Sequence, residues 1–129
     1  MHQTVRRSLR MVARAVVIVA ITLPLPVLAH HGWGGYAEAT SEISGVVELS
    51  VSLAGPHATM KVKADGHLWD VVLAPPPRTE AAGLKDGSIP VGSNVIVHGN
   101  RHRDPKRFEI KTSRVTWKDR VFNVYPDRP

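Results

Sequence analysis

The sequence predicts an all-β protein: a small five-stranded OB-like Greek-key barrel with one short helix, preceded by a signal peptide. Five short runs are rich in Val and Ile, and apolar and polar residues alternate in several of them. Turn-forming residues separate most of these runs, and a longer Pro-rich connector follows the third. A β-sandwich of this size usually has more strands, and barrel closure protects the edges of short Val-rich strands.

Residues 1–29 have the features of a signal peptide, so we exclude them from the fold. This segment carries four arginines and no acidic residue, and its apolar run at 15–23 is too short to span a bilayer comfortably. Val27-Leu28-Ala29 suits a signal peptidase, so we expect cleavage after Ala29 and a periplasmic protein. The alternatives are an uncleaved anchor and, because Arg6-Arg7 partly matches a twin-arginine signal, export in the folded state.

The composition of the expected mature chain argues against several functions. The formal net charge of the full sequence is +6, and it falls to +2 once the four arginines of the signal peptide are removed. The basic character is therefore poor evidence for nucleic-acid binding, and two Phe and two Tyr residues offer few stacking platforms for bases. The chain has no cysteine, which excludes thiolate metal sites and cysteine nucleophiles.

The mature chain is expected to form one domain between a short arm and a short tail. The first strand is long, with a bulge or bend at Gly45, and it ends at the Gly55-Pro56 turn. The five strands are expected at residues 41–53, 57–62, 67–73, 94–98 and 107–116. A stiff polyproline stretch at 75–77 and a short helix at 79–84 connect the third and fourth strands. The regions are therefore the signal peptide at 1–29, a Gly-rich N-terminal arm at 30–40, the barrel at 41–118 and a C-terminal tail at 119–129, which has the apolar residues for an edge strand.

The mature chain resembles a family of uncharacterised small exported bacterial proteins. Their mature forms begin with two histidines and aromatic residues, and they continue with a Pro-His motif, a Trp in strand three and a Val-rich strand four. The matching positions in this chain are His30, His31, Trp33, Tyr36, Gly45-Val46-Val47, Pro56-His57, Trp69, residues 91–99 and Ser113-Arg114-Val115. The resemblance implies an OB-like barrel in the periplasm, and it implies no particular activity.

Histidine is the residue type that points most directly to a function. Six of the seven histidines follow residue 29, and imidazole is a common ligand of copper, zinc and nickel. Cleavage at the expected position would give His30 a free α-amino group, which forms a chelate on Cu(II) together with its own imidazole. His31 is adjacent, His57 at a rigid strand end is the expected third ligand, and His98 or His102 is the alternative. We therefore predict a copper-binding accessory protein, although a solvated arm with surface histidines would show the same pattern.

A second possible copper site consists of Met60 on strand two with His67 and Trp69 on strand three. These side chains face one another if the two strands form a hairpin, and Trp lies favourably over a bound cation. Some small exported barrels that hold Cu(I) through His, Met and a capping Trp are similar. The opposing interpretation is that Met60 and Trp69 belong to the hydrophobic core.

An enzyme is not expected, because the chain has no nucleophile elbow, no His-Glu-x-x-His and no phosphate-binding Gly loop. The alternative to a metal-binding protein is a non-metal binding or scaffold module of the envelope, with an anionic polymer or another envelope protein as its partner. OB barrels bind ligands over strands two and three and the flanking loops. The candidate groove residues are Lys61, Lys63, Trp69, Arg101 and Arg103, and Lys106, Arg107 and Lys111 continue the basic side. A solvated basic loop is the opposing interpretation.

Overall fold

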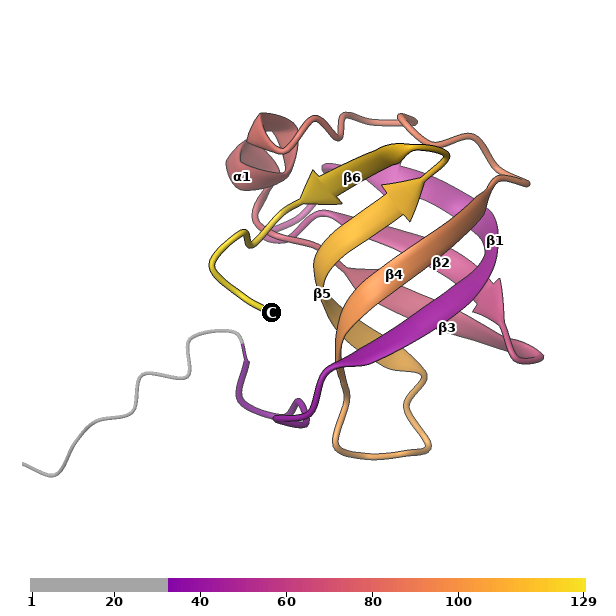
Figure 1. Ribbon diagram of the computed structural model, residues 1–129, viewed down its shortest axis with the longest axis vertical. Helices are drawn as coiled ribbons and strands as arrows, with labels where there is room; N and C mark the ends of the chain where they lie inside the picture. Colours follow the sequence, from indigo (N-terminus) through magenta and orange to yellow (C-terminus); the bar gives the residue numbers. More distant parts are fainter. Residues whose placement is uncertain (1–32) are drawn as a thin grey trace, which may run out of the picture.

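Residues 33–129, the part of the chain that the computed structural model describes, form six strands and one short helix (Figure 1). These elements are β1 (Ser41–Ser52), β2 (Thr59–Ala64), β3 (His67–Val72), α1 (Pro76–Ala81), β4 (Asn94–Arg101), β5 (Glu109–Trp117) and β6 (Arg120–Asn123). The sheet order is β3-β2-β1-β4-β5-β6, and β3 also pairs in parallel with β5, which closes the first five strands into a barrel. The predicted all-β barrel is confirmed, and the tail adds the edge strand β6.

Strand β1 serves two sides of the barrel, because its first half pairs with β4 and its second half pairs with β2. Gly45 lies next to Val46, the residue that pairs with both neighbours. A Cβ atom at Gly45 would overlap the carbonyl oxygen of Lys63 and lie 2.8 Å from Val62 and 2.9 Å from Ala64. The glycine predicted to mark a bend is therefore required by the close approach of β2.

The hairpin between β2 and β3 confirms the predicted turn. Asp65 and Gly66 both have positive φ, at 52° and 75°, as a two-residue turn of this kind requires. The turn sets a register in which Met60 pairs with Val71 and Val62 with Trp69. These four side chains are buried, so the inward faces of both strands contribute to the core.

The helix begins earlier than expected. The sequence suggested an extended polyproline stretch and a helix from Thr79, whereas α1 starts at Pro76. Proline is accommodated in the first turn of a helix, where the missing N–H has no intrahelical partner in any case. Thr79 is buried inside the helix and donates its hydroxyl to the Ala74 carbonyl oxygen at 2.8 Å, so it does not act as the N-terminal cap.

Aromatic and cationic side chains pack around Trp69 of β3. The buried Trp69 ring packs edge-on against Phe108 at 5.4 Å, and the Arg101 guanidinium lies 4.7 Å from its centroid. The rest of the core consists mainly of aliphatic residues from all six strands and the connector, among them Ile43, Val47, Leu73, Leu84, Ile89, Val97, Ile110, Val115, Phe122 and Val124. No helix within residues 33–129 is long and apolar enough to cross a membrane, and the predicted signal peptide lies outside the described residues.

Candidate functional site

The N-terminal arm, residues 33–40, is bound to the barrel. The Asn100 side-chain amide donates to the carbonyl oxygens of Ala37, Glu38 and Ala39 at 2.9, 3.1 and 3.4 Å. Tyr36 forms an isolated bridge with His102, and the Arg103 Nε donates to the Tyr36 carbonyl oxygen at 2.9 Å. The backbone carbonyl groups of this segment thus find their donors in side chains of the barrel and of the loop after β4.

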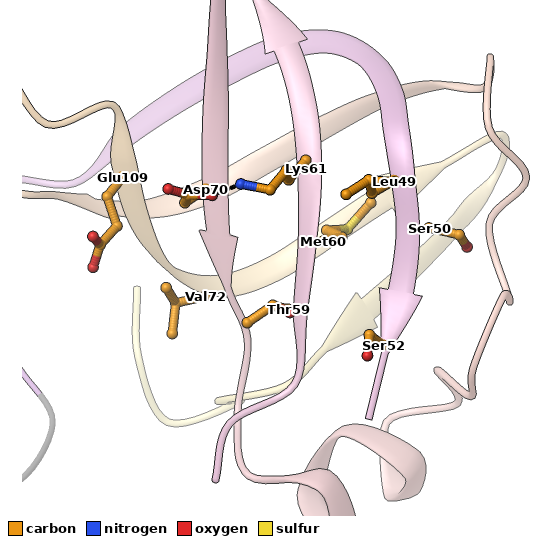
Figure 2. A pocket seen from close by; sticks show the side chains of 9 residues that line it. All are labelled: Leu49, Ser50, Ser52, Thr59, Met60, Lys61, Asp70, Val72 and Glu109. Atoms are coloured by element: carbon orange, nitrogen blue, oxygen red, sulfur yellow. Dashed lines mark hydrogen bonds and ion pairs between the residues drawn. The ribbon is translucent and has the colours of Figure 1, made fainter. Parts of the chain in front are cut away.

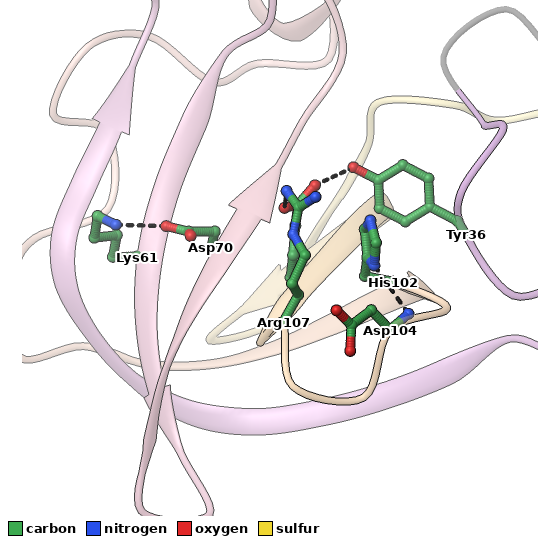
Figure 3. A network of polar contacts seen from close by, with 7 residues as sticks. Tyr36, Lys61, Asp70, His102, Asp104 and Arg107 are labelled. Carbon is green, nitrogen blue, oxygen red and sulfur yellow. Dashed lines mark hydrogen bonds and ion pairs between the residues drawn. The ribbon is translucent and has the colours of Figure 1, made fainter.

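Tyr36 also anchors the arm through its side chain (Figure 3). Its hydroxyl donates to one oxygen of Glu109, and the Arg107 guanidinium donates to the other oxygen at 2.7 Å. Burial, and then the hydrogen bond to Glu109, raise the pKa of the Tyr36 hydroxyl well above its usual range. Tyr36 therefore remains a protonated donor at any physiological pH, and the anchor does not depend on pH in that range.

His102 lies against the arm, but its Nε2 carries a proton and so has no free lone pair for a metal ion. The His102 Nδ1 accepts the backbone N–H of Asp104 at 3.0 Å (Figure 3). A neutral imidazole has one donor and one acceptor nitrogen, so this bond places the proton on Nε2. The Nε2 atom lies on the side of Gly35, 3.7 Å from where a Cβ atom would stand. Coordination through Nε2 would therefore require loss of the bond from Asp104.

The other predicted ligands do not come together within the described residues. His30 and His31 lie outside them. His57 lies in the β1–β2 loop, and burial, with a smaller effect of the charge on Lys111, lowers its pKa and favours the neutral ring. His98 lies on β4, with its Nδ1 3.4 Å from Glu42 on β1. In residues 33–129, no group of three or more His, Asp or Glu side chains is placed to hold a metal ion.

The residues of the second predicted copper site have structural contacts. Met60 is buried in the core, and the Trp69 Nε1 donates to the Ala64 carbonyl oxygen at 3.2 Å. The Trp69 ring already has the Arg101 guanidinium over it, 4.7 Å from its centroid. His67 stacks on Phe108 at 3.8 Å, with the two ring planes nearly parallel.

A groove lies over β1, β2 and β3, on the side where OB barrels bind ligands (Figure 2). Its volume is about 350 Å³, and the lining residues are Leu49, Ser50, Ser52, Thr59, Met60, Lys61, Asp70, Val72 and Glu109. Two of these lining residues, Lys61 and Asp70, form an ion pair (Figure 2). Of the five predicted groove residues, only Lys61 lines the groove. Leu49 was missed although it is 55% exposed, because an apolar residue in an alternating run was assigned to the core.

A second feature that the sequence did not reveal is the environment of Lys111. This residue was expected on a basic surface, but it is only 2% exposed. Its ammonium lies 5.6 Å from the ring centre of Trp33 and 5.7 Å from that of Tyr125. The N-terminal arm and the C-terminal tail therefore both cover it. The pKa of Lys111 is lowered to about 8, mainly by burial; the charge of Glu109 opposes this shift, and that of Arg128 adds to it.

Comparison with models of known protein families gave no match, and a search of curated proteins found no relative of this chain. The resemblance to uncharacterised exported proteins stays a prediction.

Proposed function

We propose that this protein is a non-catalytic binding module of the cell envelope that holds a short extended peptide segment in the groove over β1, β2 and β3. The groove itself supports this proposal most strongly, because it combines an exposed apolar side chain with polar groups on a continuous strand surface. Leu49 and Val72 offer apolar contact, while Thr59 and Ser52 offer hydroxyl groups. None of the nine lining residues is aromatic, so stacking of sugars or bases has no platform there.

The Lys61–Asp70 pair would determine how such a segment is oriented. Its members are 39% and 56% exposed, so each can exchange its partner for a charged or polar group of the ligand at little cost. An extended peptide presents alternate side chains to a sheet surface, one set toward Leu49 and the other toward solvent. The groove therefore suits a peptide with an apolar side chain beside a charged one.

The test is titration of short apolar and charged peptides into isotopically labelled protein, followed by amide NMR. We expect shifts confined to the groove strands, and an affinity loss of at least about tenfold for Leu49→Ser, since burying a leucine side chain contributes ~1.5–3 kcal/mol. Leu68→Ser is a matched control, because Leu68 is 50% exposed on β3 outside the groove. Equal losses in both variants, or shifts spread over the whole barrel, would contradict the proposal.

Copper binding through the mature N-terminus is the second candidate. The docked arm favours it, because the bonds from Asn100 and Arg103 hold the chain at residues 36–39, shortly after His30 and His31. A chain of three residues reaches only about 11 Å, so Trp33 limits where the His30 amine can go. The lowered pKa of His57 keeps that imidazole neutral, as a ligand must be.

Mass spectrometry and copper titration test this candidate. A mature protein that starts at His30 should bind one Cu(II) ion per chain, with affinity lost in His30→Ala and weakened in His31→Ala and His57→Ala. His67→Ala is the control, because His67 is stacked on Phe108 and has no part in the proposed site. A different starting residue, or equal affinity in all variants, would contradict it.

A further inference from the structure

We propose that the cavity between the arm and the tail binds a phosphate monoester. This arm–tail cavity has a volume of about 290 Å³, and its lining includes Trp33, Tyr36, Glu38, Asn100, Arg103 and Arg128. It lies outside the groove over β1, β2 and β3, and the two share no lining residue. The N-terminal arm and the C-terminal tail approach each other here, since Trp33 and Tyr125 contact edge-to-face at 5.2 Å.

Two guanidinium groups line this cavity. The Arg128 guanidinium lies 3.8 Å from the ring centre of Trp33, and the Arg103 Nε is fixed by the Tyr36 carbonyl oxygen. The ion pairs in residues 33–129 join Lys61 to Asp70, His98 to Glu42 and Arg107 to Glu109, so neither cavity arginine is paired there with a carboxylate. Both groups therefore retain N–H donors in the fork arrangement that matches the oxygens of a phosphate.

A third cation lies behind Trp33. Lys111 is only 2% exposed, and its ammonium lies close to the rings of Trp33 and Tyr125. No carboxylate within residues 33–129 forms an ion pair with it. Glu109 acts on this charge only in part, since the pKa of Lys111 is still lowered. A buried charge without an ion-pair partner is costly, so its presence beside two arginines indicates a site that an anion completes.

The charge balance selects the class of anion. Three cations, Lys111, Arg103 and Arg128, lie in or directly behind the cavity, and Glu38 is the one carboxylate among the lining residues. Glu109 also acts on Lys111, but its charge is balanced by its ion pair with Arg107. The excess is about two positive charges, which a phosphate monoester with a charge of about −1.5 to −2 at neutral pH neutralises. A single carboxylate would leave part of this excess in place. Trp33 and Tyr36 then offer apolar contact to the group that carries the phosphate.

A phosphate monoester in the envelope comes either from a soluble molecule or from a lipid headgroup. The purified protein should therefore be titrated with glycerol 3-phosphate, followed by calorimetry, and with vesicles of phosphatidylcholine that contain phosphatidic acid, followed by sedimentation. Saturable binding of the soluble probe identifies a soluble ligand. Binding only to the vesicles with phosphatidic acid, and not to pure phosphatidylcholine, identifies a headgroup.

The variants are chosen to change one charge each. Arg128→Gln and Arg103→Gln should each weaken binding at least tenfold, as expected for loss of a charge-assisted hydrogen bond. Glu38→Gln should strengthen binding about twofold or more, because it removes the one carboxylate that lines the cavity. Arg120→Gln is the matched control, since Arg120 is exposed on β6 and its guanidinium lies over Phe122, away from the cavity.

Thermal unfolding of each variant shows whether it is folded, so that a lost fold is not mistaken for a lost site. Equal weakening by Arg120→Gln and Arg128→Gln would show attraction to net charge only, and it would overturn the proposal. The absence of saturable binding to both probes at about 10 mM would also overturn it. Because Leu49→Ser changes the groove alone, it should leave phosphate binding unchanged, which separates this site from the peptide site.

Discussion

Replacing Lys111 by methionine should stabilise the protein. The side chain is buried under Trp33 and Tyr125, where burial lowers its pKa from 10.5 to about 8. A lowered pKa for a base means that the folded state disfavours the charged form relative to the unfolded state. Methionine has a similar length, no charge, and a flexible side chain that packs well against aromatic rings.

The expected size of the effect follows from that shift. One pKa unit corresponds to about 1.4 kcal/mol, so the penalty at neutral pH is at most ~3.4 kcal/mol. Methionine also loses the cation–π attraction to the two rings, ~0.5–1 kcal/mol each, and solvent near the arm–tail cavity screens part of the penalty. We therefore expect Lys111→Met to raise the free energy of unfolding by about 1–2 kcal/mol at neutral pH.

The pH dependence gives this prediction a second test. Below about pH 8 the amine is protonated in both folded and unfolded protein, so the full penalty applies. Between about 8 and 10.5 the folded state releases its proton first, so the stability of the original protein rises toward that of the variant. The pKa values of Tyr36 and Tyr125 are raised, but both proteins contain these groups, so their effect largely cancels in the difference.

Urea unfolding of both proteins at about pH 7 and about pH 9.5 measures both effects. Lys63→Met is the control, because Lys63 is an exposed lysine on β2, and it should change stability by less than ~0.5 kcal/mol. The reasoning is refuted if Lys111→Met destabilises the protein while Lys63→Met is neutral, or if its advantage does not shrink at the higher pH.

Three further substitutions test the contacts that position the arm and the barrel strands. Gly99→Ala should destabilise by at least ~3 kcal/mol in urea unfolding, because its Cβ would overlap the backbone carbonyl oxygen of Lys111; a change below 1 kcal/mol would show that the strands can separate. Asn100→Ala removes the donor to three arm carbonyl groups, so it should cost ~1–2 kcal/mol and speed amide exchange selectively at residues 33–40; uniform exchange would contradict this. Lys61→Ala breaks an exposed pair with Asp70 and should cost under ~0.5 kcal/mol, a loss that shrinks further in high salt.

The barrel could be predicted because its strands carry local patterns. Alternation places Met60 and Val62 inward on β2, and both are buried. Asp65-Gly66 specifies the turn, and the length of the first strand with Gly45 in it specifies the bend. Each of these patterns involves residues that are close together in the sequence, so it can be recognised from one sequence alone.

The candidate sites depend on contacts between distant parts of the chain, which no local pattern records. Lys111 belongs to the outward face of β5, and its burial results from an arm and a tail that begin and end the described chain. The Asn100 amide likewise binds an arm about 60 residues earlier. The same holds for two of the histidines: His67 stacks on Phe108, 41 residues later, and His102 accepts the backbone N–H of Asp104, and the composition of the chain shows neither contact.

The two proposed ligands of the arm region should affect each other through charge. Copper at His30 would add positive charge within a short chain distance of Trp33, near Arg128 and Arg103, whereas a phosphate in the arm–tail cavity would neutralise these arginines. A saturating phosphate monoester should therefore tighten copper binding severalfold, and copper should tighten phosphate binding by the same factor, because coupling between sites is reciprocal. This coupling should disappear in Arg128→Gln and persist in Arg120→Gln. Competition between the two ligands would show instead that they share one site, in which case the cavity and the N-terminal chelate are not separate.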